Sequence, residues 1–188
     1  MGREMAEMMG LWGGHMTLVD SLCAHENPVV AHRARRLLAG EPSTAPAMRR
    51  LRRAIGASDM ARRLLLALDG ERFNPYRKWQ GPHWTLYSLA EIGFPAGDER
   101  LLPLRHRIMD WMFAPAFLKP PSTAILPGEP DRPRRCASME GNAVWSQLAL
   151  GIVDRERAPL LVGRLIAFQW PDGGWNCDKR PGARTSSV

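Results

Sequence analysis

The segment QWPDGGWNCD, residues 169–178, combines two tryptophans, a proline and a Gly-Gly pair directly after a predicted helix. Pro171 restricts φ to the value preferred at the second position of a turn, and Asp172 with Gly173 completes a common turn sequence. A glutamine at the helix end can reach back over such a turn, while the second tryptophan offers a flat apolar face and one N–H donor. We therefore predict a clasp that closes a helical hairpin. Its residues are Gln169, Asp172, Gly173, Gly174 and Trp175.

Upstream of this clasp, the chain reads as helices interrupted by proline and glycine. Apolar side chains recur at helical spacing in residues 99–113, and Gly93 follows the apolar residues 84–92 as a helix stop. Further helices are predicted at residues 28–39, 48–55, 59–68, 140–150 and 156–169. No segment has a convincing strand pattern. The sequence therefore predicts an all-α fold without significant β-sheet.

A weak internal repeat organises the second half of the chain. The stretch GPHWTLYSLAEIGF, residues 81–94, aligns with MEGNAVWSQLALGI, residues 139–152. Each unit is expected to be a short helix, a glycine-ended turn and a longer helix, and such hairpins bury their apolar faces only by stacking on neighbours. We predict a basic, irregular helical region over residues 1–72 and a repeat region over residues 73–188. Its hairpins span residues 81–113 and 139–175, separated by a proline-rich loop at 115–135.

The clasp resembles the QW motif of the terpenoid cyclase and protein prenyltransferase superfamily, which includes the squalene-hopene cyclases. The match is Gln169, Gly173 and Trp175, with Asp172 before the first glycine. In this family, helical hairpins close into an α/α-toroid, and the Gln and Trp of the motif are structural and tie adjacent hairpins together. The resemblance implies an incomplete toroid, because only the second hairpin carries the motif and Arg164 stands where the family has an aromatic.

The catalytic motifs of this superfamily are absent. Terpenoid cyclases use an Asp-x-Asp-Asp acid and prenyltransferases hold zinc with an Asp-x-Cys pair, and the chain contains neither. Two clear hairpins are also too few to close a toroid, so we expect a partial or degenerate member. The resemblance implies an apolar isoprenoid-type ligand, but it leaves open whether any reaction is catalysed and on which substrate.

The resemblance directs attention to residues around the starts of the first helix of each hairpin. Glu140 and His83 are the candidates for acid or base chemistry; a carboxylate favoured by the helix dipole is the simpler role for Glu140. Aromatic side chains line the cavity in terpenoid cyclases, and their counterparts here also suit ordinary core packing. These candidates for ligand contact are Trp79, Trp84, Tyr87 and Trp145.

Three cysteines at wide spacing do not form a disulfide framework. Cys136 and Cys177 flank the second hairpin, but zinc takes three or four thiolate or imidazole ligands. We therefore predict no cofactor and no metal site, with zinc at this cysteine pair as the weaker alternative and packed free thiols as the simpler role.

The net charge of +7 comes from arginine clusters at residues 33–36, 49–53 and 62–63. A basic surface attracts anionic partners, and it also serves as an ordinary solvated helix face; we do not expect nucleic acid to be the partner. The alternative to an apolar-ligand protein is thus a non-catalytic helical-repeat binding module with a basic N-terminal face. No apolar run approaches roughly 18 residues and no secretory signal is evident, which predicts a cytoplasmic protein. Peripheral membrane contact through residues 48–68 is left open.

Overall fold

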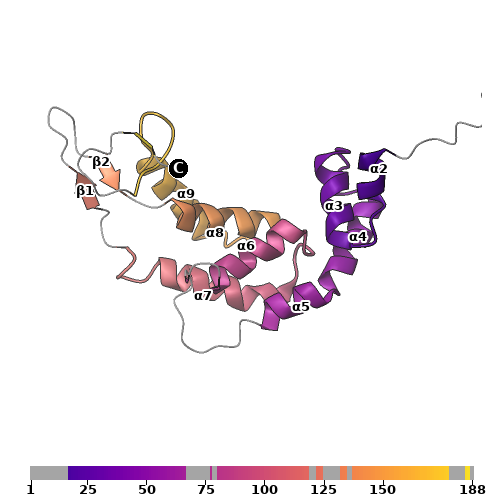
Figure 1. Ribbon diagram of the computed structural model, residues 1–188. Coiled ribbons are helices and arrows are strands. Elements are labelled where there is room, and N and C mark those ends of the chain that lie inside the picture. The colour runs from indigo at the N-terminus through magenta and orange to yellow at the C-terminus, as the bar shows by residue number, and fades with distance from the viewer. Residues whose placement is uncertain are drawn as a thin grey trace, which may run out of the picture.

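The computed structural model describes residues 17–66, 77, 80–118, 122–124, 132–134, 137–177 and 185–186, and most of them are helical. This confirms the all-α fold class (Figure 1). The helices are α2 (Leu18–Cys23), α3 (Pro28–Leu37), α4 (Pro46–Gly56), α5 (Asp59–Leu66), α6 (Pro82–Ile92), the 3-10 helix η1 (Glu99–Leu101), α7 (Leu102–Met112), α8 (Ser138–Ala149) and α9 (Ala158–Ala167). Two short strands, β1 (Ser122–Ala124) and β2 (Arg132–Arg134), complete the described elements.

The two hairpin turns share one geometry that follows directly from their glycines. Gly93 has φ +82° and Gly151 has φ +64°, a left-handed conformation that other residues adopt only with strain. The next residue donates its N–H back into the helix in both cases, from Phe94 to Leu89 O at 3.0 Å and from Ile152 to Gln147 O at 3.0 Å. Phe94 and Ile152 are buried, so each turn also adds a side chain to the core.

The expectation of a longer second helix in each hairpin is wrong. α6 and α7 both have 11 residues, whereas α8 has 12 and α9 has 10. The second helices are shorter than expected for two reasons. Residues 99–101 form the separate 3-10 helix η1 and are not part of α7, and α9 begins only at Ala158, after a turn over residues 155–157. The register of the two turns is unaffected.

The proline-rich loop at residues 115–135 also departs from expectation, since it contains β1 and β2. The strands pair antiparallel with Thr123 opposite Pro133. The segment lacks the alternation of apolar and polar residues that marks a half-buried strand, and proline, which Pro133 contributes, is unfavourable in a central strand. Proline is tolerated in edge strands, however, and a two-stranded ribbon consists only of edges. Each strand has only three residues, so the ribbon leaves the all-α fold class unchanged.

The core lies between the four hairpin helices. They stack in the order α9, α8, α6, α7, with α6 and α8 side by side at the centre (Figure 1). α5 packs on α6 from the N-terminal side. Each fully buried aliphatic side chain in this core contributes about 1.5–3 kcal/mol to stability. The largest of the fully buried side chains in it are Phe94, Leu86, Leu89, Leu101, Ile108, Met109, Met112, Leu150 and Leu161.

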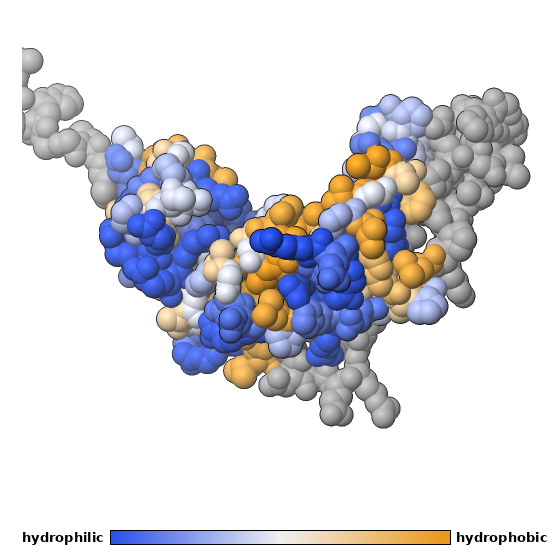
Figure 2. Space-filling model, turned by 180° about the vertical axis from the view of Figure 1, so that it is seen from behind, coloured by the Kyte–Doolittle hydropathy of each residue, from blue (hydrophilic) through white to orange (hydrophobic). Residues whose placement is uncertain are grey.

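The N-terminal helices α2, α3 and α4 form a second group that meets the hairpins at the turn after α6. Arg33 of α3 donates to the backbone oxygen of Glu91 at 2.8 Å and contacts its carboxylate at 2.5 Å. The ring of His32 lies directly over Gly93. Figure 2 shows a hollow between the two groups, with hydrophobic residues along its floor and hydrophilic ones on the N-terminal side. In the part of the chain that the structure describes, no helix is long and apolar enough to cross a membrane.

Candidate functional site

The predicted clasp forms a tight loop after α9. The side-chain Nε2 of Gln169 donates to Gly173 O at 2.6 Å, as expected for a glutamine that reaches back over the turn. The backbone closes the same loop, because the N–H of Trp170 donates to Gly174 O at 2.8 Å and the N–H of Gly173 donates to Trp170 O at 2.9 Å. These bonds leave the clasp with a rigid backbone.

Asp172 of the clasp points outward to a later part of the chain. It accepts from the N–H of Ser186 at 2.7 Å and from the N–H of Gly174 at 3.4 Å. The hydrogen bond from Ser186 is the main reason that the pKa of Asp172 is lowered. The carboxylate therefore anchors residues near the end of the described chain, a role that its place in the turn sequence did not reveal.

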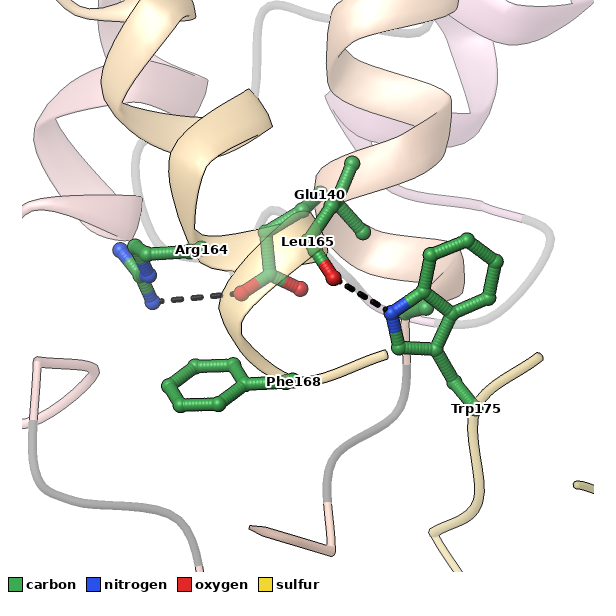
Figure 3. Close-up of a pocket in the computed structure, with 6 residues that line it drawn as sticks. Glu140, Arg164, Leu165, Phe168 and Trp175 are labelled. Carbon is green, nitrogen blue, oxygen red and sulfur yellow. Dashed lines mark hydrogen bonds and ion pairs between the residues drawn. The ribbon is translucent and has the colours of Figure 1, made fainter. Parts of the chain in front are cut away.

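Trp175 caps the helix that precedes it. Its Nε1–H donates to Leu165 O at 2.8 Å (Figure 3). Leu165 lies in the last turn of α9, where backbone carbonyls have no partner within the helix. Both hydrogen bonds made by the Gln169 and Trp175 side chains thus fall within residues 165–175, so they stabilise the end of their own hairpin.

Glu140 faces Arg164 from the first turn of α8. Its Oε1 lies 3.2 Å from Nη2 of Arg164, and the two side chains are 2% and 16% exposed. The guanidinium of Arg164 also lies 5.0 Å from the ring centre of Phe117 and donates to Met112 O at 3.4 Å. Phe168 and Trp175 line the same pocket (Figure 3). This geometry supports a structural ion pair, since the carboxylate is almost completely buried.

His83, the other acid or base candidate, is buried near the start of α6. It hydrogen-bonds with the backbone of Ser138, at the start of α8. Burial lowers the pKa of His83 to about 4, and the hydrogen bond with Ser138 only partly opposes this effect. A neutral, 1% exposed imidazole joins the two central helices, so at neutral pH it has no proton to give as an imidazolium acid.

The predicted aromatic residues of α6 and α8 come together in one row. The ring centres of Trp84 and Tyr87 are 6.0 Å apart, and those of Tyr87 and Trp145 are 5.1 Å apart. All three side chains are half-buried. Trp79 lies outside the described residues. The row therefore unites the two central helices and keeps part of its surface accessible.

The metal hypothesis finds no support around Cys177. This cysteine is exposed, and Cys136 lies outside the described residues. Within the described ranges, no three His, Cys, Asp or Glu side chains gather as a metal site would require.

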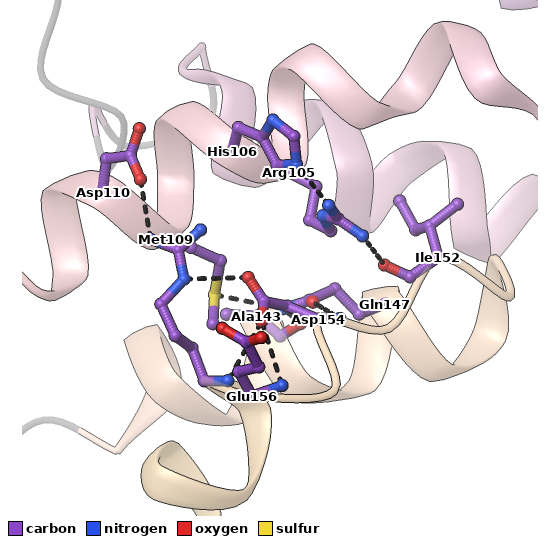
Figure 4. A network of polar contacts seen from close by, with 10 residues as sticks. Arg105, His106, Met109, Asp110, Ala143, Gln147, Ile152, Asp154 and Glu156 are labelled. Carbon is purple, nitrogen blue, oxygen red and sulfur yellow. Dashed lines mark hydrogen bonds and ion pairs between the residues drawn. The ribbon is translucent and has the colours of Figure 1, made fainter.

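A buried amide that sequence reasoning missed links the two hairpins. Nε2 of Gln147 donates to Ala143 O at 2.9 Å and contacts the sulfur of Met109 at 3.3 Å, while Oε1 accepts from the N–H of Asp154 at 2.9 Å (Figure 4). Asp154 in turn pairs with Arg157 at 2.8 Å, and Arg157 reaches Asp110 of α7 at 2.6 Å. The only signal in the sequence was a glutamine among apolar neighbours.

Burial and hydrogen bonding act in opposite directions on Asp154. Burial raises the pKa of its carboxyl, but the hydrogen bonds from the backbone and side chain of Arg157 outweigh this effect and leave the pKa lowered. The carboxylate stays ionised and holds the turn before α9. This network is therefore structural.

Comparisons of the chain with protein-family models, with curated proteins and with solved structures returned no match.

Proposed function

We propose that this protein is a helical-repeat binding protein of the terpenoid cyclase and prenyltransferase type, which holds an apolar isoprenoid-like ligand against the aromatic row of α6 and α8. One observation carries the proposal, namely that Trp84, Tyr87 and Trp145 form a continuous and partly accessible set of rings. Aromatic faces of this kind offer a large apolar contact area at little cost in side-chain entropy.

The stacking of the hairpins supports this choice of ligand surface. α6 and α8 lie side by side, with α7 and α9 on either side of the pair (Figure 1). In a toroid of hairpins, the first helix of each hairpin faces the interior, which is where an apolar ligand would be shielded from water. The aromatic row belongs to these first helices.

Binding without catalysis is the function that the polar groups favour. Glu140 is buried and paired with Arg164, and His83 is neutral and joins α6 to α8. Both candidates for acid or base chemistry are therefore occupied in stabilising the hairpins.

Titration with farnesol, followed by tryptophan fluorescence and calorimetry, tests the proposal. We expect saturable binding that weakens about 3- to 10-fold in Tyr87→Ala and in Trp145→Ala, because each variant removes one aromatic contact. Trp111→Ala is the matched control, since Trp111 lies outside the row and packs on Phe117, with 4.9 Å between the two ring centres. Absence of binding, or equal affinity in the parent and in both row variants, would reject the proposal.

A further inference from the structure

A cavity of about 470 Å³ lies where the N-terminal helices meet the ends of α6 and α8. A volume of this size is typical of small-molecule sites, which range from about 300 to 1,000 Å³. The N-terminal helices contribute polar and charged side chains, and the hairpins contribute apolar ones such as Ala90 and Leu148. The polar residues that line it are His32, Arg36, Glu41, Ser43 and Arg52.

The arginines of this cavity carry charge that no acidic side chain among the described residues neutralises. Among the described residues that line the cavity, Glu41 is the only acid, and Arg35 holds its carboxylate at 3.1 Å. No ion pair within the described ranges involves Arg36 or Arg52. Burial, and then the neighbouring Arg36, lower the pKa of Arg52. Two guanidinium groups thus share one cavity at an electrostatic cost to the folded chain.

His32 adds a buried polar group to the same cavity. It is 2% exposed, and no described residue accepts from or donates to its Nδ1. The buried Nε of Arg52 likewise has no hydrogen-bond partner among the described residues. Burial, followed by the charges of Arg52 and Arg36, lowers the pKa of His32 to about 4. Buried nitrogens without partners beside two uncompensated cations are costly unless an anion completes them.

We propose that this cavity binds a phosphate-bearing ligand, whose phosphate group lies between Arg36 and Arg52 beside His32. The planar guanidinium presents paired N–H donors that match phosphate oxygens, and such charge-assisted hydrogen bonds are stronger than neutral ones. The cavity is larger than one phosphate group needs, so the ligand includes a further moiety that contacts the apolar wall at Ala90 and Leu148. His32 and Arg36 also line a smaller adjoining pocket with Trp145, but the cavity that we assign to the phosphate group is not lined by any ring of the aromatic row among the described residues.

Titration with inorganic phosphate at constant ionic strength tests the proposal on the complete chain. The ring resonances of His32 are followed by NMR, with the exposed His106 as an internal reference. We expect a saturable shift at His32 and a rise in the unfolding temperature with phosphate concentration. In R36Q/R52Q the affinity should fall about tenfold or more, because each arginine contributes a charge-assisted hydrogen bond. The matched control is R53Q, whose arginine is exposed next to Arg52 and does not line the cavity.

Vesicles distinguish a free phosphate compound from a lipid headgroup. Co-sedimentation compares phosphatidylcholine vesicles with vesicles that also contain phosphatidic acid. Binding to phosphatidic acid that is lost in R36Q/R52Q, without binding of inorganic phosphate, assigns the phosphate group to a lipid. The proposal is overturned if neither probe binds, or if R36Q/R52Q binds each probe as well as the parent. Removal of two like charges should not lower the unfolding temperature, and thermal unfolding of R36Q/R52Q without ligand checks that loss of binding is not caused by unfolding.

Discussion

The two hairpins end differently although their turns are alike. At the end of α7, Met112 O accepts from Arg164, which belongs to the second hairpin. At the end of α9, Leu165 O accepts from Trp175, only ten residues further along the chain. One helix end is thus completed by a neighbouring hairpin and the other by a local clasp. The difference shows that a repeat can keep its turn chemistry while it obtains its terminal hydrogen bonds from different places.

The largest expected effect comes from the buried ion pair of Glu140 with Arg164, the residue that donates to the end of α7. Glu140→Ala leaves Arg164 buried without its partner carboxylate, which should lower the free energy of unfolding by about 3–5 kcal/mol. Urea denaturation measures this loss. In the double variant Glu140→Leu/Arg164→Met most of the stability should return, because an apolar pair of similar volume removes both charges. A loss below about 1 kcal/mol in Glu140→Ala would contradict a structural ion pair.

The two turn glycines provide the next test, because their surroundings differ. A Cβ at Gly93 would lie 2.3 Å from the ring of His32, whereas one at Gly151 would lie 3.2 Å from Cβ of Ala96. Both substitutions by alanine strain a positive φ, at a cost of about 1–2 kcal/mol. Gly93→Ala should therefore cost about 3 kcal/mol in total, against about 1–2 kcal/mol for Gly151→Ala.

Removal of the ring isolates the contribution of the contact. Gly93→Ala in a His32→Ala background should cost only as much as Gly151→Ala, since the strain of the backbone remains and the clash is gone. Chemical denaturation of the parent, Gly93→Ala, His32→Ala and the double variant gives the coupling energy. An equal loss of unfolding free energy for Gly93→Ala in both backgrounds would show that the ring of His32 does not clash with a Cβ at this turn.

The start of α6 should make the stability of the protein depend on pH, because it carries the buried His83. The unfolded chain binds a proton at His83 near pH 6.5, whereas the folded imidazole binds it only near pH 4. Unfolding therefore takes up a proton in this window, so the contribution of His83 to stability is present above pH 6.5 and declines by about 3 kcal/mol toward pH 4. In His83→Gln the free energy of unfolding should fall less steeply over this range than in the parent. Equal slopes in the two proteins would contradict a neutral buried His83.

Local signals made much of this fold predictable. Pro28 begins α3 and Gly93 ends α6, as their positions in the sequence predicted. The reach of Gln169 across its turn was also expected from the sequence alone. Each of these features depends on residues within about one helical turn of each other, where turn and capping chemistry operate.

The features that the sequence did not reveal depend on distant partners. Arg164 looked like a departure from the aromatic pattern, and its meaning appears only with Glu140 on α8 and Phe117 after α7. The ring of His32 lies over Gly93, 61 residues away, and the contact of Gln147 with Met109 spans 38 residues, so neither could be predicted from neighbouring residues. The pairing of β1 with β2 was not predicted for another reason, because it depends on strand register and the segment shows no alternation of apolar and polar residues.

The smallest expected effect tests the local clasp itself. Trp175→Phe keeps an aromatic face but removes the Nε1–H donor, which leaves Leu165 O without that bond. We expect a loss of about 1 kcal/mol in the free energy of unfolding, measured by urea denaturation. Trp111→Phe is the matched control, because Trp111 packs through its ring on Phe117. If both variants lose the same amount, the ring and not the hydrogen bond holds the end of α9. If Trp175→Phe alone also increases amide exchange at Phe168 and Gln169, the clasp caps the helix, and the contrast with the cross-hairpin contact at Met112 stands.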